Sequence, residues 1–224
     1  LRDSLLQKKT ISQPWYLTPQ MEIFAFVGWF SLINYSTWIP HLSFSFMGVN
    51  TMTIVDKAYA FAFAAHAAMD QRRKYTGELY IEHPCRVVEI IKNHASIPYA
   101  YDYGVLAAAY LHDVVEDVPN IDIGTIDVFF GVTIGSIVWS LTDTEKGSRA
   151  VRKRAAADRL AKAPESAQTI KYADIEDNAL SIIANDPKFA KVYMREVRYL
   201  LSVMTGGCPI LRQRCLNIVS DYYK

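Results

Sequence analysis

The sequence predicts an all-α fold, and three observations support this prediction. Apolar residues recur at helical spacing through most of the chain from residue 54 onward. No segment alternates apolar and polar residues with a period of two, and no Asn-Gly or Asp-Gly pair offers a hairpin turn. Prolines and glycines fall between the periodic segments, where they begin or end helices. We therefore expect a bundle of about eight to ten helices.

The first three predicted helices can be justified from their composition. The first is rich in alanine, with aromatic residues at helical spacing, and a basic turn follows it. Pro84 suits the opening of the second helix, because proline is favoured at the first helical position. The third is expected to run without a break to its acidic end and to stop before Pro119. These three helices span residues 54–71, 83–93 and 101–116.

The later helices are separated by clear helix breakers. Gly131 divides two short apolar helices, and a basic amphipathic helix comes next. Pro164 precedes a long helix that contains a second acidic group. Pro187 and Pro209 begin the last two helices. The six predicted ranges are 123–130, 132–141, 149–162, 165–185, 187–204 and 209–223.

Length, charge and cysteine content narrow the class of protein. The 224 residues are enough for one domain with a full core, because a domain of this size buries about 70% of its unfolded surface. A net charge of +1 gives no reason to expect nucleic acid as a partner. Cys85, Cys208 and Cys215 show no CxxC spacing, which argues against a cysteine zinc site or a disulfide framework. This cysteine usage favours a reducing, cytoplasmic setting.

Residues 1–50 differ from the rest of the chain. They hold five charged residues and ten aromatic residues, and the apolar stretch 21–38 is interrupted by Glu22 and Asn34. We expect an atypical extension here and a separate domain over 51–224. Three interpretations of the extension stay open: a non-native start with Met52 as the natural one, an extra packing or oligomerisation element, or a membrane anchor.

The most informative feature is a group of four ionisable residues in the apolar segment 107–117. His112-Asp113 is followed three residues later by Glu116-Asp117. If one helix carries all four, His112 stacks over Glu116 and Asp113 over Asp117, because residues four apart share a face. Burying these charges costs several kcal/mol each, by order of magnitude, unless something compensates them. A divalent metal ion would do so.

Four side chains are candidate ligands for such an ion: His83, His112, Asp113 and Asp174. Two imidazoles and two carboxylates suit Mn²⁺, Fe²⁺ or Zn²⁺ better than Ca²⁺. A set of this kind leaves positions for water and substrate, and a water bound to a metal becomes a nucleophile near neutral pH. An isolated histidine such as His66 is more often solvated or hydrogen-bonded than a ligand, and it is not included.

The motifs around these residues carry a resemblance to a known family. In their order along the chain they resemble the HD superfamily of metal-dependent phosphohydrolases and, within it, the hydrolase domain of RelA/SpoT-type alarmone enzymes. The resemblance covers about residues 53–205. The chain has no room for the synthetase and regulatory domains of the long enzymes, so it resembles a stand-alone small alarmone hydrolase. The matching motifs are QRRK at 71–74, YIEHP at 80–84, LHDVVED at 111–117, FG at 130–131, LTD at 141–143 and KYAD at 171–174 with Asn178.

The resemblance implies a helical HD bundle around one metal site, with the four candidate ligands holding one ion, usually Mn²⁺. Glu116 and Asp117 would position or activate the attacking water and handle protons. The resemblance also implies that Arg73 and Lys74 meet the nucleotide, Arg73 by stacking on the base. Further expected substrate contacts are Asn178, Tyr80, Thr142 and Asp143.

The implied reaction is hydrolysis of the 3′-pyrophosphate of ppGpp or pppGpp to GDP or GTP and pyrophosphate. The basic segment 149–162 could edge the pocket, although a solvated face is the plainer interpretation. The substrate is a small nucleotide, and an alarmone-synthesising toxin could be the functional counterpart. The oligomeric state is left open.

Two positions depart from the family pattern. Ala68 stands where the family usually has a histidine three residues before Gln71, and His66 lies out of register. Ile175 stands where the family usually has an arginine or a lysine directly after the last ligand. Three alternatives therefore stay open: an adenosine alarmone, another nucleotide such as a phosphorylated dinucleotide or a deoxynucleotide, or a silent nucleotide-binding module.

Overall fold

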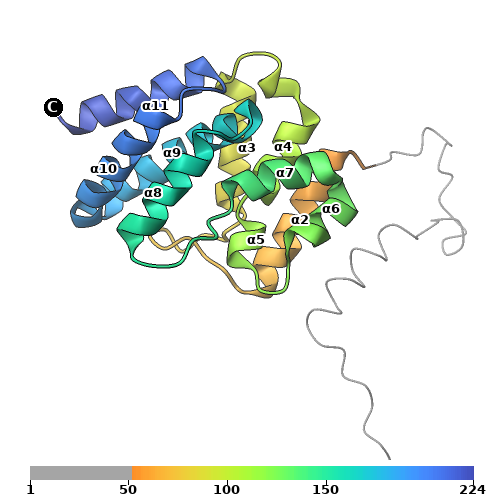
Figure 1. The fold of residues 1–224 in the computed structure, drawn as a ribbon. Coiled ribbons are helices and arrows are strands. Elements are labelled where there is room, and N and C mark those ends of the chain that lie inside the picture. Colours follow the sequence, from red (N-terminus) through yellow and green to blue (C-terminus); the bar gives the residue numbers. More distant parts are fainter. Residues whose placement is uncertain (1–51) are drawn as a thin grey trace, which may run out of the picture. The chain divides into compact units, whose positions relative to one another are not determined.

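The structure is a computed structural model that describes residues 52–224 (Figure 1). In this range the chain forms α-helices, one short 3₁₀ helix and no strand, apart from an isolated bridge between Arg72 and Leu79. The all-α prediction is confirmed. No helix within 52–224 has both the length and the apolar character needed to cross a bilayer. The predictions for residues 1–50 lie outside the described residues, and the division into extension and domain stays a prediction.

The first half of the described chain packs around α4. This helix contacts α2, α3 and α7, and α6 packs against α7. The side chains of α4 between Val105 and Leu111 are almost all buried, so the helix forms part of the core. The elements of this half are α2 (Ile54–Ala68), α3 (Glu82–His94), η1 (Tyr99–Tyr101), α4 (Tyr103–Leu111), α5 (Val114–Asp117), α6 (Ile123–Phe130) and α7 (Val132–Leu141).

The second half packs around α9, which contacts α3, α4, α7, α10 and α11 (Figure 1). More than half of its residues are buried, including the ionisable side chains of Asp174, Glu176 and Asp177. Charges inside such a helix need partners, because an unpaired buried charge is costly. The elements of this half are α8 (Arg149–Leu160), α9 (Glu165–Asn185), α10 (Pro187–Val203) and α11 (Pro209–Tyr222).

The predicted helix 101–116 is wrong as a single element. Helix α4 ends at Leu111, His112 and Asp113 form a turn, and α5 begins at Val114. His112 Nδ1 lies 2.8 Å from Ala109 O, the carbonyl that the N–H of Asp113 would use in an unbroken helix. The expected stacking of His112 over Glu116 does not apply, because these two residues do not share one helix. Asp113 caps the start of α5, and its carbonyl still accepts a hydrogen bond from the N–H of Asp117 at 2.9 Å.

The first helix also ends earlier than predicted. Helix α2 begins with a capping box between Thr53 and Asp56 and ends at Ala68, followed by Asp70 in the left-handed region with φ of 44°. The chain then doubles back through the Arg72–Leu79 bridge. This tight segment carries Gln71 and Arg73 towards α5 and α9, where both find partners.

Candidate metal centre

The four predicted ligands come from three separate elements and meet in space. His83 is the second residue of α3, His112 and Asp113 form the turn between α4 and α5, and Asp174 lies in the middle of α9. His83 Nε2 lies 3.1 Å from Asp174 Oδ1 and 3.6 Å from Asp113 Oδ2. His112 Nε2 lies 3.1 Å from Asp113 Oδ2 and 3.8 Å from Asp174 Oδ1. One small volume therefore holds two imidazole nitrogens and two carboxylates.

Both imidazoles present a free nitrogen to this volume. His83 and His112 are almost completely buried, and neither Nε2 has a hydrogen-bond partner among residues 52–224. The other ring nitrogen of each is occupied, Nδ1 of His83 by Asp177 and Nδ1 of His112 by Ala109 O. An Nδ1–H tautomer leaves the lone pair on Nε2, which is the form that binds metals. These two nitrogens and the Asp113 carboxylate lie close enough together to hold one divalent metal ion, and Asp174 Oδ1 lies within 3.8 Å of both nitrogens.

The charges of the cluster shift one another's pKa strongly. Burial alone would lower the pKa of His112, but Asp113 and Asp174 outweigh burial and raise it. Burial would likewise raise the pKa of Asp174, but Lys171 and the two histidines lower it well below its usual value. The Lys171 ammonium lies 2.7 Å from Asp174 Oδ2. The cluster thus favours two ionised carboxylates with added positive charge beside them, which an ion or protons can supply.

The predicted acidic pair lies on α5, next to the cluster. The Glu116 carboxylate accepts a hydrogen bond from the backbone N–H of Asp143 at 3.1 Å, and its side chain reaches solvent. The Asp117 carboxylate accepts one from the Gln71 amide at 2.8 Å. Partial burial and then the nearby Asp113 carboxylate raise the pKa of both residues. Both can therefore exchange protons closer to neutral pH than ordinary carboxyl groups do.

Sequence reasoning set His66 aside, yet it supports this pair. His66 Nδ1 lies 2.7 Å from Gln71 Oε1, and the amide of Gln71 in turn binds Asp117. His66 is buried and lies one helical turn after the buried Ala62. Ala68, where the family usually has a histidine, is exposed. The helical period of the buried face was the signal that could have identified His66.

Three of the predicted substrate-binding residues adjoin the cluster. Tyr80 Oη donates to Asp113 Oδ2 at 2.7 Å. The Asn178 amide donates to Asp174 Oδ1, and its oxygen accepts from Arg73 at 3.0 Å. Each of these three side chains is therefore linked directly, or through one intermediate residue, to a predicted ligand.

The structure does not bring Lys74 or Thr142 to the cluster. Lys74 is exposed and lies 3.6 Å from Asp186, with its ammonium over the rings of Tyr75 and Phe189. Thr142 is buried at the end of α7, where its hydroxyl donates to a carbonyl of that helix at 2.9 Å.

Asp143 reaches the acidic pair through its backbone, and its side chain is held by α8. Its carboxylate accepts hydrogen bonds from Lys153 at 2.7 Å and from Arg159 at 3.2 Å. Both cations belong to the basic segment that the sequence suggested as an edge of the pocket. In the structure these two residues fix the Asp143 loop, which contacts Glu116.

Sequence reasoning also assigned no role to two charged partners on α9, although one of them belongs to the KYAD motif. Lys171 and Asp177 lie three residues before and three residues after Asp174, so helical spacing puts all three on one face. Lys171 binds Asp174, and Asp177 binds His83. Charged residues at this spacing inside an apolar helix were the signal that could have identified them.

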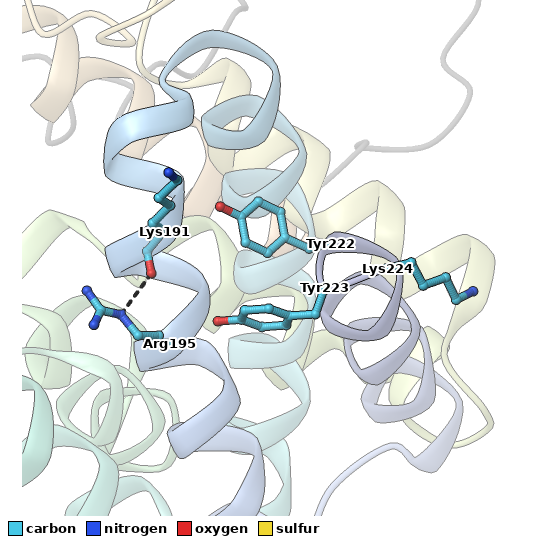
Figure 2. Close-up of a pocket in the computed structure, with 5 residues that line it drawn as sticks. All are labelled: Lys191, Arg195, Tyr222, Tyr223 and Lys224. Carbon is cyan, nitrogen blue, oxygen red and sulfur yellow. Dashed lines mark hydrogen bonds between the residues drawn. The ribbon is translucent and has the colours of Figure 1, made fainter.

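A surface pocket shares no residue with the cluster. Figure 2 shows that Lys191 and Arg195 of α10 line it together with the C-terminal residues Tyr222, Tyr223 and Lys224. The drawn hydrogen bond joins Arg195 to the backbone oxygen of Lys191. The residues with the features of a reaction centre are therefore in the buried cluster and not in this pocket.

Comparison with known proteins gives a family match and several curated relatives. The HD domain family matches residues 58–184, more than half of the chain. A Drosophila melanogaster protein named guanosine-3′,5′-bis(diphosphate) 3′-pyrophosphohydrolase MESH1 is 36% identical over 126 residues, which cover 56% of this chain and 68% of that protein. The human protein of the same name is 34% identical over 113 residues, which cover 50% of this chain and 61% of that protein. The match thus spans about two thirds of the relatives' length.

Solved structures show the same arrangement of helices. One is described as a metazoan ortholog of SpoT that hydrolyzes ppGpp and plays a role in starvation responses. It superposes with a TM-score of 0.68 at 26% identity, over 78% of this chain and 98% of that one. A Listeria monocytogenes protein superposes with a TM-score of 0.54 at 22% identity, over 67% of this chain, and supports the fold alone.

Proposed function

The chain belongs to the HD domain family, and we propose that it hydrolyses the 3′-pyrophosphate of guanosine alarmones. Water would add across the bond between the ribose 3′ oxygen and the diphosphate, so that ppGpp gives GDP and pyrophosphate. The observation that carries the proposal is the pair of buried Nε2 atoms that lie 3.1 Å from Asp174 and Asp113 and have no hydrogen-bond partner in the described chain. The names of the similar proteins support the choice of substrate.

The ligand set would hold one divalent ion, which we take to be Mn²⁺. When bound, such an ion polarises a phosphoryl oxygen and acidifies a water molecule. His83 and His112 are held in the tautomer that offers Nε2, and Asp113 and Asp174 balance positive charge. Because Tyr80 fixes Asp113 and Lys171 fixes Asp174, the four ligands are arranged before an ion binds.

The acidic pair would move the protons of the reaction. Glu116 reaches solvent and can accept a proton from the attacking water, since partial burial has raised its pKa. Gln71 orients the Asp117 carboxylate through a hydrogen bond. Asp117 in its protonated form can donate a proton to the leaving 3′ oxygen. Proton transfer of this kind typically contributes about 10²- to 10⁴-fold to a rate.

Arg73 and Asn178 would meet the nucleotide at the edge of the centre, because Asn178 binds Asp174 and Arg73 binds Asn178. Tyr80, Lys74, Thr142 and Asp143 remain predicted contacts. The partner is a small nucleotide in a cytoplasmic setting, and an alarmone-synthesising toxin as counterpart remains a prediction.

Incubation of the purified chain with ppGpp and Mn²⁺ tests the proposal. Separation of the products should show GDP and pyrophosphate in equal amounts, and a chelator should stop their release. Addition of excess Mn²⁺ after the chelator should restore it. Release of single phosphate, or turnover that the chelator leaves unchanged, would contradict the proposal.

A second candidate substrate is an adenosine alarmone or another nucleotide. Ile175, where the family usually has a cation, is 2% exposed and packs in the core, so it offers no charge to a base or phosphate. A panel of ppGpp, its adenosine counterpart and deoxynucleotides at equal concentration would separate the candidates by kcat/KM. Binding of ppGpp without turnover in Mn²⁺ buffer would instead favour a silent nucleotide-binding module.

A further inference from the structure

Asp177 is a buried carboxylate that receives hydrogen bonds from three side chains outside its own helix. It lies on α9, one turn after Asp174, and is 9% exposed. His83 Nδ1 lies 2.6 Å from its Oδ2, and Arg73 donates to the same oxygen at 3.1 Å. Arg86 donates through Nε to Oδ1 at 2.6 Å. Neither the metal ligand set nor the acidic pair includes this residue.

The contacts of Asp177 decide which nitrogen of His83 is free. Both carboxylate oxygens accept from guanidinium groups, which keep their protons in proteins, so Asp177 is the acceptor in this network. In the neutral imidazole that binds a metal, Nδ1 of His83 must then carry the hydrogen that it shares with Oδ2, which leaves the lone pair on Nε2. That lone pair faces Asp113 and Asp174. A carboxylate behind a histidine also fixes the plane of its ring and raises its basicity as a ligand.

The same oxygen also holds Arg73, the predicted nucleotide contact. Arg73 spans Asp177 and Asn178 with its two terminal nitrogens, and its side chain is only 10% exposed. The direction of the Arg73 side chain is therefore determined by Asp177, the same carboxylate that determines the tautomer of His83. We propose that Asp177 is a positioning residue that holds the candidate metal ligand His83 and the predicted nucleotide contact Arg73 in one arrangement. This inference rests on the metal site of the proposed function and on no particular nucleotide.

Asp177→Asn is the first test, because it keeps the shape of the side chain and removes one acceptor. An amide has one oxygen and an NH₂ group, so the three converging donors cannot all be satisfied. Calorimetric titration with Mn²⁺ should show affinity about 10- to 100-fold weaker than in the wild type, the usual cost of losing an outer partner of a metal ligand. Affinity equal to that of the wild type would overturn the inference.

Glu176→Gln is the matched control. Glu176 is the preceding residue on α9, is also buried, and pairs with Arg214. This variant removes a buried negative charge from the same helix and should bind Mn²⁺ with nearly wild-type affinity. If both variants lose affinity equally, loss of charge or of packing explains the effect and the inference fails.

A spectroscopic measurement addresses the tautomer directly. With Zn²⁺ as a diamagnetic probe, long-range ¹H–¹⁵N spectra should show His83 with a protonated Nδ1 in the wild type and a changed Nδ1 signal in Asp177→Asn. Asp177→Glu keeps an acceptor and should recover part of the Mn²⁺ affinity. An unchanged His83 signal, or equal losses in the two Asp177 variants, would overturn the inference.

Mn²⁺ titration together with the ppGpp assay distinguishes a failure of this inference from a failure of the proposed function. A wild-type chain that binds no Mn²⁺ would overturn both. A wild-type chain that binds Mn²⁺ but does not hydrolyse ppGpp would contradict the function and leave the role of Asp177 standing. Equal Mn²⁺ binding by the wild type and Asp177→Asn would overturn the positioning role alone.

Discussion

Single side chains in the centre are each held by a second side chain. Tyr80 holds Asp113, Lys171 holds Asp174, and Gln71 holds Asp117. A buried polar group without a partner costs about 1–3 kcal/mol, so such pairs keep charged groups in place that would otherwise destabilise the core. The two Nε2 atoms of the ligand histidines are exceptions within the described chain, and they face the same carboxylates. The other buried side-chain atoms of the described chain without a hydrogen-bond partner are His66 Nε2 and Asp127 Oδ1, so the candidate centre holds two of these atoms together.

Glu116→Gln should keep metal binding and lose most of kcat. The amide still accepts a hydrogen bond from Asp143, but it cannot accept a proton from water. We expect kcat to fall by about 10²- to 10⁴-fold, with the Mn²⁺ affinity close to that of the wild type. Steady-state kinetics and metal titration on the same sample check both parts. A turnover rate near that of the wild type would show that Glu116 does not accept the proton.

The pH dependence of kcat should reflect the ionisation of Glu116. Partial burial raises the pKa of Glu116, and the nearby Asp113 carboxylate adds to the shift. The base must be ionised to accept a proton, so kcat should fall as the pH drops through this raised pKa. The acidic limb of the pH profile should lie above the usual range of a glutamate and should be lost or displaced in Glu116→Gln. An unchanged acidic limb in the variant would assign that limb to another group.

Asp113→Ala should remove metal binding and turnover together. Its carboxylate lies within 3.6 Å of both ligand nitrogens, and no other side chain of the turn can replace it. Metal analysis after dialysis and product assays on the same sample would measure the two losses. Cleavage of ppGpp by the Asp113→Ala variant without bound metal would contradict this prediction.

At the scale of elements, short breaks position the site. The turn at His112-Asp113 separates α4 from α5, so the ligands and the acidic pair approach the centre from two directions. The tight segment after α2 brings Gln71 and Arg73 to α5 and α9. Helix α2 contributes His66 near its C-terminal end, while its capping box lies at the opposite end. A change at the capping box should therefore alter the stability of α2 without altering the chemistry of the site.

Thr53→Ala should lower stability without changing the site. The Thr53 hydroxyl accepts from the N–H of Asp56 at 3.1 Å, and loss of such a cap typically costs about 1 kcal/mol. Thr53 lies about 20 Å along the helix axis from His66, given the rise per residue of a helix. Urea unfolding should show the loss, with Mn²⁺ affinity unchanged. Thr76→Ala, in an exposed turn, is the control and should change the free energy of unfolding by less than about 0.5 kcal/mol.

At the scale of the whole molecule, the centre joins parts of the core that lie far apart in the sequence. Its candidate ligands come from α3, the α4–α5 turn and α9, and α9 contacts both α10 and α11. An ion bound there would therefore stabilise the native arrangement of all three elements at once. Binding to the folded state alone raises the free energy of unfolding by mass action.

Mn²⁺ should therefore stabilise the protein against urea, and a chelator should reverse the effect. At an ion concentration 100 times the Kd, the expected gain is about 2.7 kcal/mol. Urea curves with Mn²⁺ and with chelator would measure it in the wild type and in Asp113→Ala, which should show no gain. Equal gains in the two proteins would mean that Mn²⁺ acts elsewhere on the chain.

The sequence by itself determined the helical class, most of the helix bounds and the set of ionisable residues around His112. These properties depend on periodicity and on residue type, which are local. Only the tertiary structure decided that the helix breaks at His112-Asp113, and that His66 and Asp177 hold Gln71 and His83. The bond between His83 and Asp177 joins residues 94 apart, which helical spacing on one segment cannot specify. The bonds of His112 to Ala109 and of His66 to Gln71 are local, but they depend on where the backbone turns after α4 and α2. The local sequence pattern predicts which chemical groups are present, and the packing of the folded chain determines which atom each of these groups contacts.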